Sequence, residues 1–148
     1  GWKESRQHEV PADTVLAAER PDVPDNRMLL VFSGELRGRR SNTPAGFAGY
    51  YCRRAVETVL PIRAEYRVDA LPGSDRERIA GRAATTIRLR SFSSPPVYCL
   101  ARVAEVEPRK VIGVVVLAVG DLQTSDARLL DRVSERIEVV APDSTPAE

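Results

Sequence analysis

The clearest pattern in the chain is a change of hydrophobic period between residues 45 and 70. From Ala45 to Leu60, apolar side chains recur in pairs every four residues, which predicts an amphipathic helix. From residue 62 to residue 70, apolar and charged residues alternate, which predicts a half-buried strand. The helical positions expected to face the core are Phe47, Ala48, Tyr51, Cys52, Ala55, Val56, Val59 and Leu60. This pattern therefore predicts a structural role for the segment in packing the core, and it contains no recognisable catalytic motif.

Similar patterns predict five more strands and a second helix, the strands lying at residues 13–19, 27–36, 79–90, 97–104 and 111–119. The last of these runs is apolar on both faces, so we expect a central strand covered on both sides. Residues 12–19 could instead form a short helix, because Ala and Leu favour helices. Thr124 or Ser125 can cap the second helix, whose apolar stripe is Leu130, Val133 and Ile137.

The expected element order is β-β-α-β-β-β-β-α. Short turns between successive strands favour an antiparallel sheet with helices packed on it, which is an α+β fold. The 148 residues are enough for one core and no linker divides them, so we expect a single domain at residues 12–141. Residues 1–11 and 142–148 are mostly polar and are expected to form flexible tails.

Composition narrows the class of protein. Hydrophobic residues make up 43% of the chain and charged residues 29%, which are ordinary values for a globular domain. A net charge of +1 with interspersed acids and bases argues against nucleic acid as a partner. No apolar run approaches the roughly 20 residues that span a bilayer. The chain begins with Gly rather than Met, so we expect a processed product or part of a longer protein, with an anchor possible upstream.

The chain offers few residues for catalysis. His8 is the only histidine and lies in an expected tail, which argues against a catalytic triad. One His and two distant Cys do not make a zinc site, and no phosphate-binding or calcium-binding motif is present. We therefore expect no catalytic residues, no metal and no cofactor.

The two cysteines are expected to face the same layer between helix and sheet. Cys52 lies on the inward stripe of the first helix, and Cys99 shares a strand face with Ala101 and Val103. Two interpretations stay open at this point. The cysteines are either free, buried thiols or partners in a disulfide, and a disulfide would place the domain outside the cytoplasm.

Two groups of arginines are candidate contact sites for a protein partner or an anionic group. One is the polar loop after the second strand, with Arg37, Arg39 and Arg40. The other is an outward-facing row on the strands, with Arg82, Arg88 and Arg90 beside Arg63 and Arg67. The alternative is an ordinary charged sheet face, in which Glu65 and Asp69 neutralise the arginines across strands.

The segment Ile-Ala-Gly-Arg-Ala-Ala-Thr-Thr-Ile-Arg-Leu at 79–89, two further strands and a helix leading to Arg-Ile-Glu-Val-Val at 136–140 resemble the PsbP and DcrB type of protein. Its actinobacterial envelope lipoprotein relatives share this layout. The resemblance implies an α/β/α sandwich. It also implies an accessory or binding protein of the cell envelope or thylakoid lumen, without a shared catalytic set, so no functional residue is carried over.

Our hypothesis is a non-catalytic accessory or binding domain of a bacterial cell-envelope protein, exported or membrane-anchored, that meets a protein partner in the envelope. The alternative fold is a cystatin-like or nuclear-transport-factor-like α+β roll that binds or transforms a small molecule. The alternative location is the cytoplasm. A cavity lined by Tyr51, Tyr66 or Tyr98 would favour the roll. A filled layer between helix and sheet would favour the accessory domain.

Overall fold

The computed structural model describes residues 3–4, 14–19, 27–37, 43–59, 66–70, 78–92, 96–120 and 122–137. Its elements, in chain order, are β1 (Lys3–Glu4), β2 (Thr14–Glu19), β3 (Arg27–Glu35), α1 (Pro44–Val59), β4 (Tyr66–Ala70), β5 (Arg78–Ile79), β6 (Arg82–Ala83), β7 (Thr85–Ser91), β8 (Val97–Glu107), β9 (Lys110–Val119) and α2 (Thr124–Arg136). This is the α+β fold with two helices that the sequence predicts. Neither described helix combines the length and the apolar character needed to cross a membrane.

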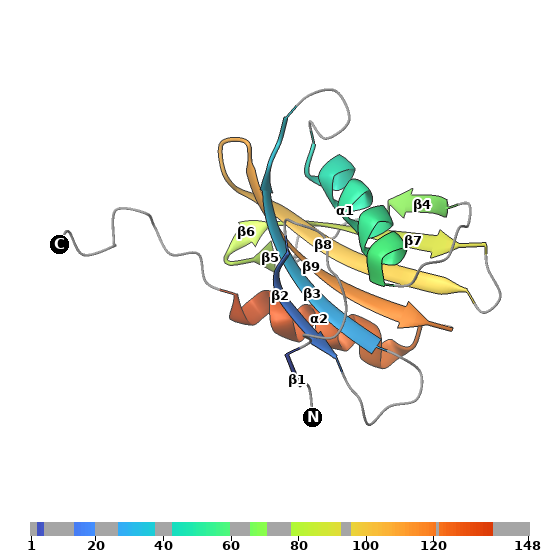
Figure 1. Ribbon diagram of the computed structural model, residues 1–148. Helices are drawn as coiled ribbons and strands as arrows, with labels where there is room; N and C mark the ends of the chain where they lie inside the picture. The colour runs from blue at the N-terminus through green and yellow to red at the C-terminus, as the bar shows by residue number, and fades with distance from the viewer. Residues whose placement is uncertain are drawn as a thin grey trace.

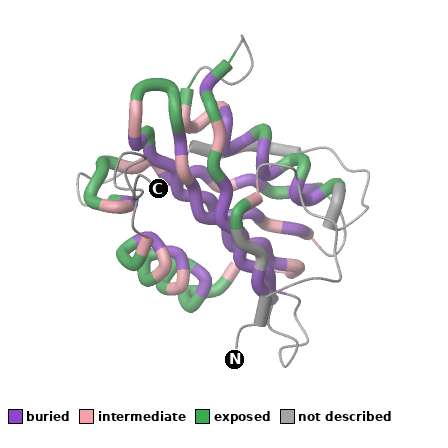
Figure 2. Tube along the Cα trace, turned by 60° about the vertical axis from the view of Figure 1, so that its left-hand side comes forward, coloured by how far each residue is buried: buried purple, intermediate pink, exposed green. Residues whose placement is uncertain are grey.

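Seven strands form one antiparallel sheet in the order β1-β2-β3-β9-β8-β7-β4, and α1 and α2 cover its two faces (Figure 1). The expected central strand is confirmed, because β9 lies in the middle and pairs with β3 and β8 along its length. Five consecutive residues of β9, Val114 to Ala118, are buried. Figure 2 shows this buried core as a band that runs through the sheet.

The helix α1 carries the chain across the sheet. β3 lies beside the central strand, whereas the next strand of this sheet along the chain, β4, forms the far edge beyond β8 and β7. α1 covers the crossing and packs on β7, β8 and β9. The expected sandwich of helix, sheet and helix follows from this crossover together with α2 on the opposite face.

Aromatic side chains fill the layer under α1. The Phe32 ring of β3 stacks on the Tyr51 ring of α1, with 4.3 Å between the ring centroids, and lies 5.7 Å from the Phe47 ring. Two glycines of the sheet make room for these rings. A Cβ at Gly34 would lie 2.1 Å from the Phe47 ring, and a Cβ at Gly113 would lie 2.1 Å from the Phe32 ring. The layer is therefore packed to contact distance at these positions.

The opposite layer is held by the apolar stripe of α2. Leu130 is buried among Leu29, Leu100 and Val116 of the sheet, with Val133 partly buried beside it. The helix begins at Thr124 with Gln123 as its N-cap, so neither Thr124 nor Ser125 caps it as expected. The reason is Asp126, whose Oδ2 accepts a hydrogen bond from the Gln123 backbone N–H at 2.8 Å and so closes the first turn.

The expected strand at 79–90 is wrong in its first part. Residues Arg78–Ile79 and Arg82–Ala83 form a small separate hairpin, and the strand β7 begins at Thr85. Ala80 has φ 51° and Gly81 has φ 77°, the paired positive values of a tight hairpin turn. Ile79 is fully buried, and the hairpin contacts β8 and α2. The Ala-Gly step that carries the family resemblance is therefore a turn.

Apart from the additional strand β1, which lies within the tail expected at residues 1–11, the remaining elements differ only at their ends. Residues 14–19 form a strand, so the alternative short helix at 12–19 is wrong. The strand expected at 62–70 is present at Tyr66–Ala70, and residues 62–65 lie outside the described residues. β1 pairs Lys3 with Glu19 and Glu4 with Ala18, a pairing that the sequence did not predict. The domain limits 12–141 stay a prediction.

We expect Ala80→Asn to stabilise the protein by about 0.5–1 kcal/mol, because Asn tolerates the left-handed conformation better than Ala and Asn-Gly is the preferred pair for this turn. Differential scanning calorimetry should show a Tm increase of about 2–3 °C. The matched control is Gly81→Ala. Its added Cβ would meet nothing within 4 Å, so only backbone strain acts, and the Tm should fall. A lower Tm for Ala80→Asn would contradict this account of the turn.

Candidate functional site

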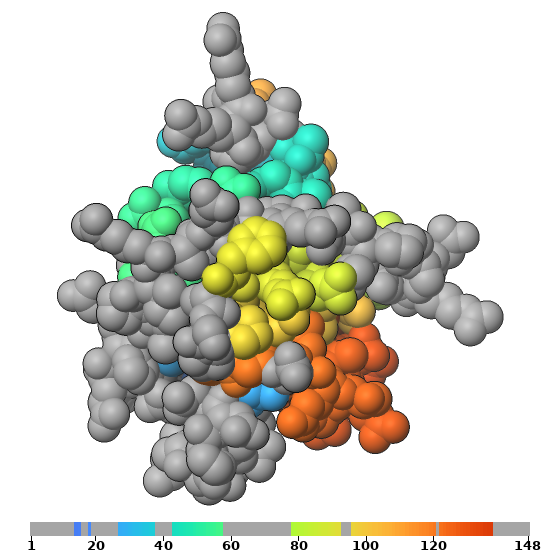
Figure 3. Space-filling view, turned by 90° about the vertical axis from the view of Figure 1, so that its right-hand side faces the viewer, coloured from blue at the N-terminus to red at the C-terminus, as the bar shows by residue number. Residues whose placement is uncertain are grey.

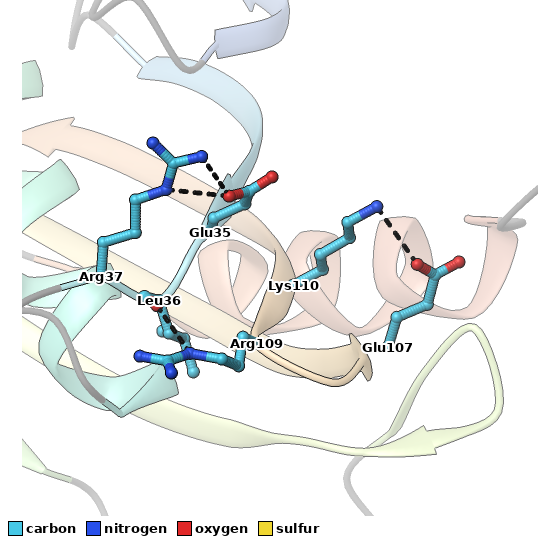
Figure 4. Close-up of polar contacts among 6 residues, drawn as sticks. All are labelled: Glu35, Leu36, Arg37, Glu107, Arg109 and Lys110. Atoms are coloured by element: carbon cyan, nitrogen blue, oxygen red, sulfur yellow. Dashed lines mark hydrogen bonds and ion pairs between the residues drawn. The ribbon is translucent and has the colours of Figure 1, made fainter.

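Charged residues lie where β3 leaves the sheet and β8 turns into β9. Figure 1 shows these two segments at the top of the sheet. We call this cluster of Glu35, Arg37, Glu107, Arg109 and Lys110 the charged end (Figure 4). It forms because the β3·β9 register places Glu35 opposite Lys110, so the loop after β3 and the β8–β9 turn emerge side by side.

Two hydrogen bonds, one between backbones and one from a side chain, hold the two segments of the charged end together. The Leu36 N–H donates to the Arg109 carbonyl oxygen at 2.7 Å, and the Arg109 Nε donates back to the Leu36 carbonyl oxygen at 3.2 Å (Figure 4). Leu36 is buried, and Arg109 has φ 65° in the turn. We call the segment from Arg37 to Arg40 the arginine loop. The two hydrogen bonds fix the residue before it, Leu36, at a defined position beside the β8–β9 turn.

Four of the five charged residues of this cluster form ion pairs at the surface, Arg37 with Glu35 and Lys110 with Glu107. The Arg37 Nε donates to the Glu35 Oε2 at 2.9 Å, and this hydrogen bond and the charge of Arg37 lower the pKa of Glu35. The Lys110 Nζ lies 3.4 Å from the Glu107 Oε2. The Arg37 side chain is 80% exposed, and water screens exposed pairs, so they contribute little to folding. Arg37 can therefore exchange Glu35 for another carboxylate or phosphate at small cost.

The structure describes four of the six predicted contact residues, which come from two groups. Arg37 lies at the charged end, while Arg39 and Arg40 lie outside the described residues. Arg82 is exposed on the β5–β6 hairpin, whereas Arg88 and Arg90 lie on β7 of the seven-stranded sheet. The expected row of Arg82, Arg88 and Arg90 is therefore divided between two sheets.

Arg88 and Arg90 lie on β7, on the face that α2 covers in part. Arg88 is half-buried and stands opposite Asp69 in the β4·β7 register, whereas Arg90 stands opposite Arg67. The register of this strand pair therefore sets opposite charges together at one position and like charges at the next. Arg90 is exposed and stacks over the Tyr98 ring at 5.6 Å. Phe92, in the turn beyond, is 59% exposed. Figure 3 shows this end of β7 and β8 in yellow, between α1 and α2.

Sequence reasoning missed Arg109 and Lys110 as neighbours of the arginine loop. It identified Glu105 to Lys110 only as a turn between strands. The link to Leu36 depends on β3 pairing with β9, which are separated by α1 and five strands along the chain. A prediction that β3 pairs with β9 would have found the charged end. In an antiparallel pair, the end of β3 lies beside the start of β9, which sets Glu35 opposite Lys110.

Both cysteines are fully buried, unbonded and part of the layer under α1. The Cys99 Sγ lies 3.9 Å from the Cys52 carbonyl oxygen. Burial raises the pKa of the Cys99 thiol well above its usual value, and a hydrogen bond with the Cys52 side chain raises it further. A protonated thiol without access to solvent is a poor nucleophile.

The described residues contain no group of three or more His, Cys, Asp or Glu side chains that could hold a metal ion. His8 lies outside them. Tyr51 and Tyr98 cannot line one cavity, because Tyr51 packs under α1 while Tyr98 shares the opposite face of β8 with Leu100. The Tyr51 hydroxyl also bonds to the Thr14 Oγ1, and its ring is covered by Phe32.

No protein-family model matches the chain, and comparison with curated proteins gives no match. Among solved structures, the chain is similar to the solution structure of cyanobacterial PsbP (CyanoP) from Synechocystis sp. PCC 6803. The two share 15% sequence identity and a TM-score of 0.53, and the match covers 91% of this chain and 79% of that one. The chain therefore has a PsbP-like fold, as the resemblance implied.

Proposed function

We propose that this chain is a non-catalytic accessory or binding domain of a bacterial cell-envelope protein, and that its charged end contacts an acidic segment of a protein partner. The observation that carries this proposal is the filled layer under α1. Phe32, Tyr51 and Val56 are fully buried there, and even a methyl group at Gly113 would overlap a ring. A domain packed in this way offers its surface to a partner, so the surface residues decide what it binds.

The charged end has the chemistry for such a contact. Guanidinium groups form two parallel hydrogen bonds to a carboxylate, which gives a geometric preference as well as charge attraction. Arg37 and Arg109 come from segments that the Leu36–Arg109 contacts hold in place, so less conformational freedom is lost on binding. Arg39 and Arg40 follow Arg37 in the sequence and add two positive charges to the same loop.

The alternative, a small-molecule or enzymatic roll, has less support. A roll of this kind holds its ligand between one helix and a curved sheet, which is the layer that Phe32, Phe47 and Tyr51 occupy. A second helix, α2, packs on the opposite face of the sheet. The side chain of Tyr66 lies outside the described residues, so its part in a cavity stays a prediction.

The proposed location is extracytoplasmic, in an exported or membrane-anchored protein. The PsbP-like fold supports this proposal, because the resemblance that predicted the fold also implies envelope proteins. A cytoplasmic location is the alternative. Protease added to cells whose outer envelope has been opened while the inner membrane stays intact tests it, since an extracytoplasmic domain would be cleaved and a cytoplasmic one protected.

The triple variant Arg37→Ser/Arg39→Ser/Arg40→Ser tests the charged end. A fluorescent peptide of ten glutamates serves as the acidic probe, and fluorescence anisotropy measures its Kd over a salt series. We expect the variant to bind at least about tenfold more weakly at low salt, with the difference shrinking as salt screens the charges. Its Tm should match that of the unmodified protein, because the Arg37 side chain is exposed and its surface ion pair contributes little to stability.

The matched control is Arg128→Ser/Arg132→Ser/Arg136→Ser, which removes the same charge from exposed positions of α2. It should retain the affinity of the unmodified protein. Equal losses in both variants would show that only net charge matters. An unchanged Kd in the loop variant at every salt concentration would show that the loop is a solvated tip, and attention would move to Arg82, Arg88 and Arg90.

A further inference from the structure

The two cysteines of the chain meet in the core although 47 positions separate them in the sequence. Cys52 belongs to α1, and Cys99 belongs to β8, the strand against which α1 makes its largest contact. Both side chains have no exposed surface, and both belong to the apolar cluster under α1. The Cys99 Sγ is directed at α1, where it lies 3.9 Å from the Cys52 carbonyl oxygen.

We propose that Cys52 and Cys99 form a disulfide while the chain folds in an oxidising compartment, and that this bond ties α1 covalently to β8. Two S–H bonds break and one S–S bond forms, so the pair releases two protons and two electrons. The electron acceptor is the disulfide of a thiol–disulfide oxidoreductase of the bacterial envelope, which is reduced to a dithiol in the exchange.

Burial decides when this reaction can occur. Thiol–disulfide exchange needs a thiolate that can reach the oxidant, and the folded core denies both conditions. Neither sulfur is exposed, and the pKa of the Cys99 thiol is raised by its burial. Exchange therefore takes place before α1 closes over the sheet. The folded protein then keeps the redox state in which it folded, because reductants are excluded in the same way.

The bond would act mainly on stability. Closing a loop of 47 residues restricts the unfolded chain, and in the chain-entropy account the effect grows with loop length. For a domain of this size we expect the oxidised form to unfold about 10 °C above the reduced form. The tie also fixes α1, which begins at Pro44, shortly after the arginine loop.

The test compares the full chain exported to the periplasm of a bacterial host with the same chain made in a reducing cytosol. Each sample is denatured without reductant, alkylated and weighed by mass spectrometry. The exported protein should carry no alkyl group and the cytosolic protein two. Two alkylated cysteines in the monomeric exported protein would overturn the proposal.

The variants Cys52→Ala and Cys99→Ala serve as matched controls. Each exported variant should expose one thiol after denaturation, and its Tm should no longer depend on the compartment of folding. The unmodified proteins should differ in Tm by about 10 °C, and equal values would contradict the stabilising role. If a variant does not fold, the masses of the unmodified protein still decide whether the bond exists. Binding of the glutamate peptide is measured separately, so either proposal can fail without the other.

Discussion

Val56→Asp is expected to abolish the cooperative unfolding transition of the domain. Val56 lies at the centre of the α1 layer with no exposed surface. An aspartate there would either stay charged in an apolar environment or take up a proton, and both cost free energy. We expect a loss of more than about 5 kcal/mol, which approaches the roughly 5–15 kcal/mol that stabilises a whole domain.

Circular dichroism during thermal unfolding measures this effect. The matched control, Arg53→Asp, adds the same carboxylate at an exposed position of the same helix and should change stability by only about 0.5 kcal/mol. A Val56→Asp protein with the Tm of the unmodified domain would show that α1 does not pack on the sheet through this side chain.

The second large effect is expected at Asp126. The Arg27 Nε donates to the Asp126 Oδ1 at 2.9 Å, and both side chains are more than nine-tenths buried. Asp126→Ala leaves the Arg27 charge buried without this carboxylate and removes the hydrogen bond to the Gln123 N–H. Removing one partner of a buried pair costs about 3–5 kcal/mol, so the midpoint of urea unfolding should fall sharply.

Two comparisons isolate the cause. Asp131→Ala breaks the pair with Arg102, whose side chain is as buried as that of Arg27, but the Asp131 side chain is 57% exposed. Water can therefore take the place of this carboxylate, and the loss should be about 1 kcal/mol. The double variant Arg27→Met/Asp126→Ala removes both charges and should recover much of the lost stability. A double variant as unstable as Asp126→Ala would show that lost capping, and not the stranded charge, dominates.

Part of the candidate site could be predicted from the sequence. Three arginines within four residues, next to a Thr-Pro step, already mark an exposed cationic loop. The contribution of Arg109 could not be predicted, because its two hydrogen bonds with Leu36 form only when β3 pairs with β9. Both bonds use a backbone oxygen as acceptor, which every residue has, so the identity of Leu36 does not reveal them. The buried Arg27–Asp126 pair was also missed, since a lone Arg and a lone Asp in a sequence look the same whether exposed or buried.

The amino-acid sequence by itself determined the two helices, six of the strands and the faces that the helices bury. The four-residue repeat of α1, the two-sided apolar run of β9 and the placing of Cys52 and Cys99 in one layer all follow from local periodicity, because that periodicity reports which side of each element avoids water. These expectations needed no knowledge of which strands pair.

The tertiary structure alone decided how those elements meet. Strand order depends on contacts between residues far apart in the chain, and many pairings satisfy the same hydrophobic pattern. Only the folded chain places β3 beside β9, brings Arg109 to the arginine loop and sets Asp126 against Arg27. The hairpin at Ala80 and Gly81 belongs here too, because burial of Ile79 against β8 favours a turn over a continuous strand.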